Sequence, residues 1–396
     1  MNLTVAGLRE RLARGEPTFL LDVRASKEFA AWKIEGAQPV AMLNVPYTRI
    51  LADADEDNLA AAAAEYLGKN VTDKIPRGPL VVAVCAKGET SAFVAEGLRA
   101  LGYESANLEG GMTAWGNHYE ELTVVDEPGL KVIQVARPAR GCLSWVVISE
   151  REAVVIDPLR HVDRYAALLE NHGARAFAVI DTHAHADHIS GGRALAAATR
   201  APYYLHPYDA IHPMDLLPAT FDFEFLHERR CLSFGASTLD VLHVPGHTLG
   251  AVALLLDGRI LFAGDTLFLE AVARPDLGGR AEAWTPLHQA SLARLLALGD
   301  DVLLCPGHFS ALGEADAVGA FVARIGALAV RNDGARRALG DAAAFASYIA
   351  SSLPVFPPQY VDIKRVNTGL IEVAEDRASE LELGKNVCAL SAAHPA

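Results

Sequence analysis

The segment THAHADH (Thr182–His188) places three histidines and an aspartate directly after the apolar run AFAVID. Residues two apart on an extended segment face the same way, so His183 and His185 can reach one point in space. Asp187 and His188 come where the chain turns and can reach a neighbouring point. Imidazoles and carboxylates are common ligands of transition metals. The motif therefore predicts a metal site at the end of a buried strand.

Three more residues of ligand type occur downstream, each where an apolar run stops. His247 follows a Pro-Gly turn in VPGHT, Asp265 lies in AGDTLF, and His308 follows another Pro-Gly turn in CPGHFS. A lone histidine at a strand end is more often a satisfied polar residue than a ligand. Seven residues of ligand type in such positions instead indicate a shared metal centre.

The segments around these motifs predict sheets covered by helices. Helices are expected at Val162–Asn171 and Gly192–Thr199, and Asp257-Gly258 is a strong hairpin turn. Strands are expected at KVIQVA, SWVVIS, AVVIDP, AFAVID, Ser237–Val244, Ala251–Leu256 and Ile260–Ala263. The last ninety or so residues are Ala-rich and helical, then Pro-rich at LPVFPPQY.

An earlier part of the chain has a different pattern. A short strand FLLDVR, a polar helix, a strand at Leu80–Val84 and a helix from Ser91 alternate as in an α/β domain. The segment LTVVDEPGL (122–130) loses periodicity and predicts a linker. We therefore expect one domain at 1–125 and a second at 131–396, whose tail (310–396) packs on it.

Cys85 has the setting of a reactive thiol. It ends a buried strand and opens the loop CAKGET, and a helix follows. Helix N-termini favour anions and lower the pKa of cysteine, so a thiolate is expected at neutral pH. Lys87 adds a cation, and Thr90 can donate a hydroxyl to an anionic adduct on the sulfur. The alternative is a structural cysteine, which is the more common state of an intracellular cysteine.

Composition excludes several classes of protein. The 396 residues carry a formal net charge of −14, which disfavours sequence-independent binding to nucleic acid. No apolar stretch approaches the length that spans a membrane, and charges interrupt the N-terminus, so neither a membrane segment nor a signal peptide is expected. Five scattered cysteines favour a reducing, cytoplasmic setting. The four cysteines other than Cys85 are expected to be structural: Cys142, Cys231, Cys305 and Cys388.

Several motifs in the first part resemble a rhodanese domain. They are LLDVRASKEF, KIEGA, VCAKGETSAFVAEGLRALGY and NLEGGMTAW, and they span most of residues 1–120. The resemblance implies a sulfurtransferase in which Cys85 carries a persulfide sulfur. The loop departs from thiosulfate-using members at Ala86, where they often have Arg, and at the acidic Glu89.

The series HxHxDH, GHT, GDT and GH resembles the metallo-β-lactamase superfamily over roughly residues 131–310. The resemblance implies an αββα sandwich with a metal site at one edge. If two metals bind, a metal-bound water could attack a thioester, as in glyoxalase II. The first metal would then take His183, His185, His247 and a bridging Asp265, and the second Asp187, His188, Asp265 and His308.

A second interpretation uses only His183, His247 and Asp265, as a two-histidine, one-carboxylate triad on a single Fe(II). The remaining four residues would then orient ligands or water: His185, Asp187, His188 and His308. Zinc could not support this chemistry because it has no redox states to use.

Two further segments resemble persulfide dioxygenases: GDTLFLEAVARPDL (Gly264–Leu277) and the tail FASYIASSLPVFPPQYVDIKRVN (Phe345–Asn367). In that family an arginine after the GD strand holds a carboxylate of a glutathione-type substrate, and Arg274 occupies the matching place. The alternative is that Arg274 only pairs with Asp276 or another acid.

The fusion favours the dioxygenase interpretation, because a persulfide-carrying domain is joined to one that could oxidise persulfides. We expect a bifunctional enzyme that uses Fe(II), O2, a thiol persulfide, and thiosulfate or sulfite. A binuclear thioester hydrolase and a non-enzymatic sulfur carrier or sensor are the alternatives. Apolar strand edges and the Pro-rich tail are compatible with a homodimer.

Overall fold

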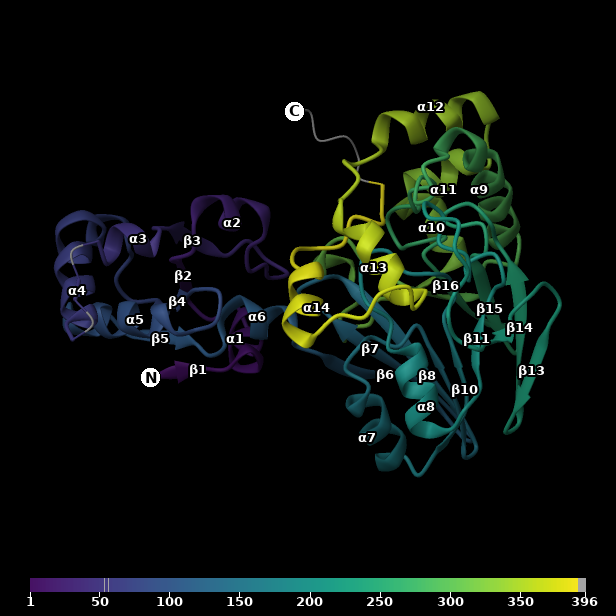
Figure 1. Cartoon of the computed structure of the whole chain (residues 1–396), viewed down its shortest axis with the longest axis horizontal. Helices are drawn as coiled ribbons and strands as arrows, with labels where there is room; N and C mark the ends of the chain where they lie inside the picture. Colours follow the sequence, from purple (N-terminus) through teal and green to yellow (C-terminus); the bar gives the residue numbers. More distant parts are fainter. Residues whose placement is uncertain (53, 56, 391–396) are drawn as a thin grey trace.

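The computed structural model describes residues 1–52, 54–55 and 57–390. An N-terminal domain and a larger C-terminal domain lie side by side (Figure 1). The N-terminal domain is built on a parallel five-stranded sheet. Its strands lie in the order β1 (Asn2–Leu3), β5 (Ser105–Leu108), β4 (Leu80–Val84), β2 (Thr18–Asp22) and β3 (Ala41–Asn44).

Helices cover both faces of this sheet, because successive side chains of its strands point to opposite faces. On β2, Phe19 and Leu21 join one apolar cluster, while Leu20 joins the other. The helical segments are α1 (Val5–Ala13), α2 (Ser26–Ala31), α3 (Tyr47–Ile50), α4 (Leu59–Asn70), the 3-10 turn η1 (Thr72–Lys74), α5 (Thr90–Ala100) and α6 (Gly111–Gly116).

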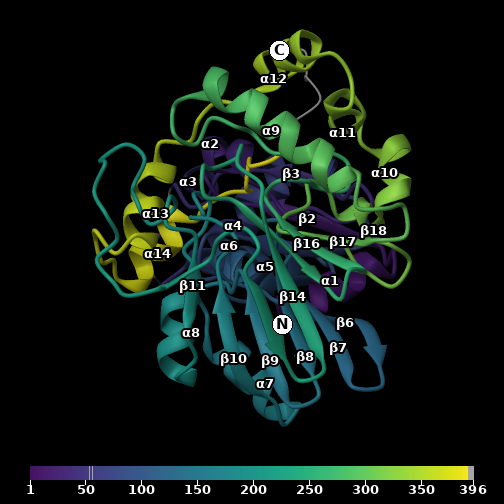
Figure 2. The same ribbon diagram turned by 90° about the vertical axis from the view of Figure 1, so that its right-hand side faces the viewer.

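The C-terminal domain is a sandwich of two mixed sheets with helices outside (Figure 2). The seven-stranded sheet has the order β12 (Glu224–Phe225), β11 (Tyr203–Leu205), β10 (Arg175–Ile180), β9 (Glu152–Ile156), β8 (Cys142–Ser149), β7 (Leu130–Arg137) and β6 (Glu120–Glu127). The six-stranded sheet has the order β13 (Cys231–Phe234), β14 (Ser237–His243), β15 (Val252–Leu256), β16 (Ile260–Gly264), β17 (Leu303–Pro306) and β18 (Ala323–Arg324).

The main core fills the space between these sheets. On β8, Trp145 and Val147 join this core, whereas Val146 and Ile148 join a second cluster under the helices that cover the outer face. The helical segments of the domain are α7 (Asp163–Asn171), α8 (Gly192–Thr199), α9 (Ala281–Leu296), η2 (Leu312–Glu314), α10 (Ile325–Arg331), α11 (Asp333–Ala338), α12 (Ala342–Ser352), α13 (Gln359–Asn367) and α14 (Glu375–Leu381).

The expected α/β fold, with a parallel N-terminal sheet followed by an αββα sandwich, is confirmed. The expected linker over 122–130 is wrong. Strand β6 covers most of that segment and pairs with β7, and Pro128-Gly129 forms the turn between them. A register irregularity between Thr123 and Val125 breaks the alternation, and charged residues mark β6 as the edge of its sheet. Both features make a strand look aperiodic in the sequence.

A buried arginine fastens the two domains together. Arg137, at the end of β7, donates from Nε to the Gly116 carbonyl oxygen (2.5 Å) and from Nη2 to the Asn117 side-chain oxygen (2.6 Å). Its Nη1 donates to Glu382 Oε2 at 2.6 Å. Trp32 Nε1 also crosses the junction, to the Ala139 carbonyl oxygen (3.2 Å). The junction is therefore a bonded interface.

Within the described ranges, every helix is too short or too polar to cross a bilayer.

Candidate metal centre and cysteine loop

Two buried carboxylates, one directly after β9 and one in the turn that follows β11, shape the loop after β10. Asp157, directly after β9, accepts hydrogen bonds from Thr182 N (2.7 Å) and Thr182 Oγ1 (2.9 Å). Asp209 accepts from Ala184 N at 2.7 Å and also from Thr248 Oγ1 at 2.7 Å. Because Asp209 bonds both the HxHxDH loop and the GHT loop, it fixes their spacing. Sequence reasoning missed both aspartates, since no local motif surrounds them.

Three ligand atoms converge on one point. His183 Nε2 lies 3.8 Å from Asp265 Oδ2, and His247 Nε2 lies 3.6 Å from the same oxygen. All three atoms are buried and have no hydrogen-bond partner in the described chain. Buried polar atoms without partners are costly, and a cation bound among them would remove that cost. This set fits one metal ion.

The other nitrogen of each histidine is already used. His247 Nδ1 donates to the Arg274 carbonyl oxygen at 2.8 Å, which leaves Nε2 as the lone-pair nitrogen. His183 Nδ1 lies 3.0 Å from Thr182 Oγ1. Burial and the neighbouring rings of His185 and His247 hold the pKa of His183 well below its usual range. A neutral imidazole is the form that binds a metal.

A second group lies beside the first. His308 Nε2 is 2.8 Å from Asp187 Oδ2, and His308 Nδ1 is 2.6 Å from Asp265 Oδ1. His188 Nδ1 is 3.1 Å from Asp187 Oδ1, and its Nε2 has no partner in the described chain. Burial would lower the pKa of His308, but Asp187 and Asp265 raise it well above its usual value. Without a metal, this group forms a network of alternating acids and histidines.

His185 is turned toward different carboxylates. Its Nε2 lies 3.2 Å from Asp157 Oδ1 and 3.8 Å from Asp181 Oδ1, and these three residues form a cluster of their own. Its ring remains close to that of His183, with centroids 4.2 Å apart. The structure thus brings all seven sequence-predicted residues into one buried region, in three neighbouring groups of which the first two share Asp265.

Cys142 and Cys388, which were expected to be structural, lie at the border of this region. Cys142 Sγ is 3.6 Å from Asp187 Oδ2, and Cys388 groups with Asp187, Asp265 and His308. Burial would raise the pKa of Cys142, but His308 and His188 beside it lower that pKa to about 6. The sequence could not predict this placement, because it depends on a β-bridge between Cys142 and the distant His308.

The tail lies against the metal loop. Asn367, at the end of α13, donates from Nδ2 to the carbonyl oxygens of His185 and His188, both at 2.9 Å. It also accepts from Ser190 N at 2.9 Å. An apolar cluster contains Ala186 of the loop and Tyr360 of α13. The tail therefore holds the backbone of the HxHxDH loop and covers it.

Cys85 lies at the far end of β4, on the loop before α5. Its sulfur accepts hydrogen bonds from Gly88 N and Ser91 Oγ, each at 3.1 Å, and its side chain is buried. Gly88 has a φ of +85°, and a Cβ there would lie 2.7 Å from Gly110 N. The loop can therefore curl around the sulfur only because residue 88 lacks a side chain.

The predicted helpers of Cys85 differ in their placement. Lys87 is exposed beside the sulfur loop, and Thr90 is the first residue of α5 and is half-buried. The hydroxyl on the sulfur belongs to Ser91, which sequence reasoning missed. Ser91 Oγ is also 2.7 Å from Asn107 Oδ1. The signal was its place in the first turn of the helix, one residue beyond the expected threonine.

Comparison with known families agrees with this geometry. Residues 4–118 match the family model of the rhodanese-like domain, and residues 137–308 match that of the metallo-beta-lactamase superfamily. The chain joins a rhodanese-like domain to a metallo-beta-lactamase superfamily domain. Each candidate site lies in one of these two domains.

The proteins and structures that match the metallo-beta-lactamase domain are named for different activities or families. A hydroxyacylglutathione hydrolase from Halorhodospira halophila is 35% identical over 176 residues, which are 44% of this chain and 60% of the relative. A metallo-beta-lactamase structure from Staphylococcus aureus has a TM-score of 0.51 at 24% identity, over 64% of this chain and 73% of that one. The structure of ETHE1 from Myxococcus xanthus has a TM-score of 0.48 at 24% identity, over 64% and 99%. At these levels the Staphylococcus match concerns the fold alone, and the Myxococcus match supports no further conclusion.

The guanidinium of Arg274, which was expected to hold a substrate carboxylate, is bonded within the chain. Its Nε and Nη2 donate to the two carboxylate oxygens of Asp276, at 2.6 and 2.7 Å. Nη2 also donates to the Pro354 carbonyl oxygen at 3.0 Å. The guanidinium fork that was expected to hold a substrate carboxylate is thus occupied by Asp276. The alternative expectation, a pair with Asp276, is the arrangement found, and the backbone oxygen of Arg274 accepts from His247 Nδ1.

Proposed function

We propose that the protein oxidises a low-molecular-weight thiol persulfide with O2 at the metal centre and transfers sulfane sulfur through Cys85. The net oxidation is RSSH + O2 + H2O → RSH + SO3²⁻ + 2 H⁺. The sulfane sulfur is oxidised to sulfite and O2 is reduced. The favoured thiol is of the glutathione type.

One observation carries the proposal. His183, His247 and Asp265 present partnerless ligand atoms to one point, as two histidines and one carboxylate, in the same chain as a rhodanese-like cysteine loop. This ligand set suits a single Fe(II), which when bound would supply the redox chemistry that zinc lacks. A domain that oxidises persulfides acts on the same sulfane sulfur that a rhodanese-like domain carries, whereas thioester hydrolysis involves no sulfane sulfur.

The surrounding residues would preserve this ligand set. Arg274 and Thr182 hold the Nδ1 sides of the two histidines, so both rings present Nε2. His308 bonds the second oxygen of Asp265 and leaves Oδ2 for the metal. The tail residues Asn367 and Tyr360 keep the backbone of the loop bonded and covered by apolar groups.

A second function has specific support. The group of Asp187, His188 and His308 could hold a further metal ion, and the similarity to a hydroxyacylglutathione hydrolase fits a binuclear thioester hydrolase. A sulfur carrier that uses Cys85 alone would need no metal residue.

Metal content and oxygen uptake test the proposal. Protein purified without oxygen and loaded with iron should hold about one iron per chain and consume O2 with glutathione persulfide or coenzyme A persulfide. It should not hydrolyse S-lactoylglutathione. Two metals per chain with oxygen-independent hydrolysis of that thioester would favour the hydrolase. Full activity in His183→Ala would favour the carrier.

A further inference from the structure

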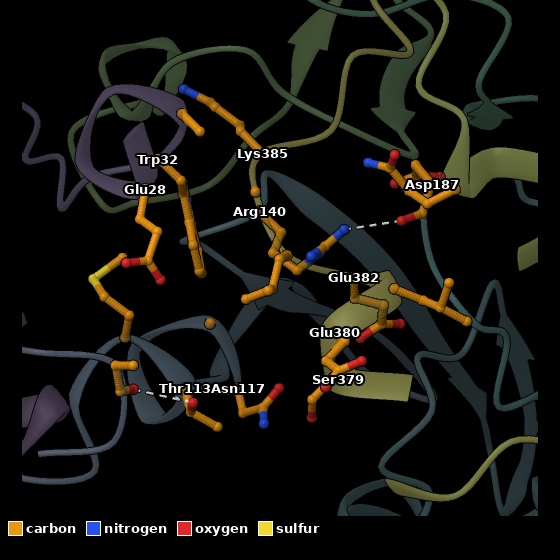
Figure 3. A pocket seen from close by; sticks show the side chains of 18 of the residues that line it. Glu28, Trp32, Thr113, Asn117, Arg140, Asp187, Ser379, Glu380, Glu382 and Lys385 are labelled. Carbon is orange, nitrogen blue, oxygen red and sulfur yellow. Dashed lines mark hydrogen bonds between the residues drawn. The ribbon is translucent and has the colours of Figure 1, made fainter. Parts of the chain in front are cut away.

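The two domains enclose a cavity of about 630 Å³ at their junction (Figure 3). One wall includes Ala86 and Lys87, the two residues that follow Cys85. The lining also includes Arg140 and Asp187, the latter from the metal loop. A single cavity therefore touches the loops of both candidate sites. Its volume is in the range that binds small molecules.

Arg140 is the unusual residue of this cavity. It lies in the turn between β7 and β8, and only 3% of its surface is exposed. Its Nη2 donates to the Asp187 carbonyl oxygen at 2.9 Å, as the dashed line in Figure 3 shows. Its Nε and Nη1 have no hydrogen-bond partner in the described chain. A buried guanidinium with unused N–H groups is costly unless an anion accepts from it.

Nearby acids make no hydrogen bond to these two nitrogens, although the charge of Glu382 interacts with that of Arg140. Glu382 Oε2 already accepts from Arg137 and Arg160, and its Oε1 accepts from Ile189 N. Arg137 is bonded at all three of its nitrogens. Arg140 thus has two nitrogens without a hydrogen bond, whereas each nitrogen of Arg137 makes one.

The remaining charges of the cavity separate by exposure. The other acidic lining residues are exposed: Glu28, Asp376 and Glu380. Of these, Glu380 pairs with Arg377 at 3.0 Å. Lys385 pairs with Glu35 at 2.7 Å across the junction. Lys87 is an exposed cation in the lining of the same cavity. The buried side of the cavity therefore holds Arg140 together with the carboxylates of Asp187 and Glu382, which are already bonded to other groups, and the remaining acids lie on its exposed side.

We propose that Arg140 is the anion-binding residue of an interdomain site, and that its ligand is a small oxyanion of sulfur, sulfite or thiosulfate. The planar guanidinium matches a pair of oxygen atoms on such an anion. The choice of sulfur rests on the proposed function, in which the metal centre makes sulfite. The site would hold that product beside the Cys85 loop.

A balanced step follows for held sulfite. The sulfite sulfur attacks the sulfane sulfur of a Cys85 persulfide and forms the S–S bond of thiosulfate. The bond between Cys85 Sγ and the sulfane sulfur breaks, and its electron pair stays on Sγ as the thiolate. No external oxidant or reductant is required. In the reverse direction, thiosulfate bound at the same site loads Cys85.

Sulfite binding tests the site without any turnover. The iron-loaded full chain carrying Cys85→Ser is titrated with sulfite, without oxygen, in a calorimeter. Adding Arg140→Gln should weaken sulfite binding at least tenfold. Adding Arg259→Gln, which removes the same charge from an exposed ion pair with Glu127, should leave it within twofold. Equal affinity with and without Arg140→Gln would overturn the proposal.

A second variant keeps the proposal testable if Arg140→Gln does not fold. Lys87 is exposed, so Lys87→Gln should fold, and we expect it to weaken sulfite binding at least threefold. If Arg140→Gln does not fold and Lys87→Gln binds sulfite as before, the proposal fails.

The outcome separates this site from the proposed function. A chain that binds sulfite through Arg140 but takes up no O2 with persulfides retains the site and loses the function. A chain that takes up O2 but binds sulfite equally without Arg140 retains the function and loses the site.

Discussion

The Nδ1 nitrogen of His308 lies 2.6 Å from Oδ1 of Asp265, while the other oxygen of Asp265 faces His183 and His247. One carboxylate therefore joins the two candidate ligand groups. In a one-metal centre, His308 orients Asp265. In a two-metal centre, His308 would be a ligand through Nε2, which lies 2.8 Å from Asp187 Oδ2 in this structure.

His308→Gln separates these two roles. We expect the iron content to stay near one per chain, and oxygen uptake with glutathione persulfide to fall by about 10- to 100-fold, as for other residues that orient metal ligands. Elemental analysis and an oxygen electrode give both values. A drop from two metals to one would instead show that His308 is a ligand of a second ion.

Cys85→Ser tests whether the chemistry of the two domains is separable. Serine is a far weaker nucleophile than a thiolate, so transfer of sulfur from thiosulfate to cyanide should fall by at least about a thousandfold. Oxygen uptake with a supplied persulfide should persist, and Asp265→Ala should show the reverse pattern. Cys231→Ser, at an exposed cysteine, is the control and should change neither activity. Loss of both activities in Cys85→Ser would contradict separate sites.

The grouping of the seven candidate ligand residues could be predicted from the sequence because each lies near the end of an apolar run. The loop THAHADH and the turns before His247 and His308 are local signals, and the structure brings them together. The strands of the sandwich follow from apolar runs in the same way. The expected pairing of β14, β15 and β16 is present, with Asp257-Gly258 at the last turn.

What the sequence does not reveal depends on distant contacts. Asp209 bonds two loops that lie far apart in the chain, and Cys142 reaches Asp187 only because β8 passes beside it. Arg274 could bind a substrate or Asp276, and only side-chain geometry distinguishes these roles. Arg140 has no motif at all. Its place in the lining of a cavity becomes visible only when the two domains are assembled.

The buried Glu382 predicts a pH-dependent junction. Burial would raise the pKa of Glu382, but Arg137, Arg140 and Arg160 hold it well below its usual range. A depressed folded pKa adds stability that is complete above the unfolded pKa of about 4.3 and is lost as the pH falls below that value. Glu382→Gln should lower the free energy of unfolding by about 3–5 kcal/mol at pH 7, because it leaves buried arginines without their acid.

Urea unfolding of Glu382→Gln at pH 7 and pH 4 measures this contribution. The difference from wild type should shrink toward the lower pH. Glu375→Gln is the matched control, because Glu375 is an exposed partner of the same Arg160 and should cost less than about 1 kcal/mol. Equal effects of the two substitutions would mean that the buried pair does not hold the junction.

Arg274→Gln distinguishes a positioning role from substrate binding. The guanidinium is buried and bonded to Asp276 and Pro354, so its loss should lower the free energy of unfolding by about 3–5 kcal/mol. Asp276→Asn, which leaves the same arginine without its partner, should have a similar effect. The backbone oxygen of Arg274 accepts from His247, so a shift of this backbone after the substitution would disturb a candidate metal ligand and not a substrate contact. We therefore expect kcat for persulfide oxidation to change more than KM. A large rise in KM with unchanged stability would instead place the guanidinium on the substrate.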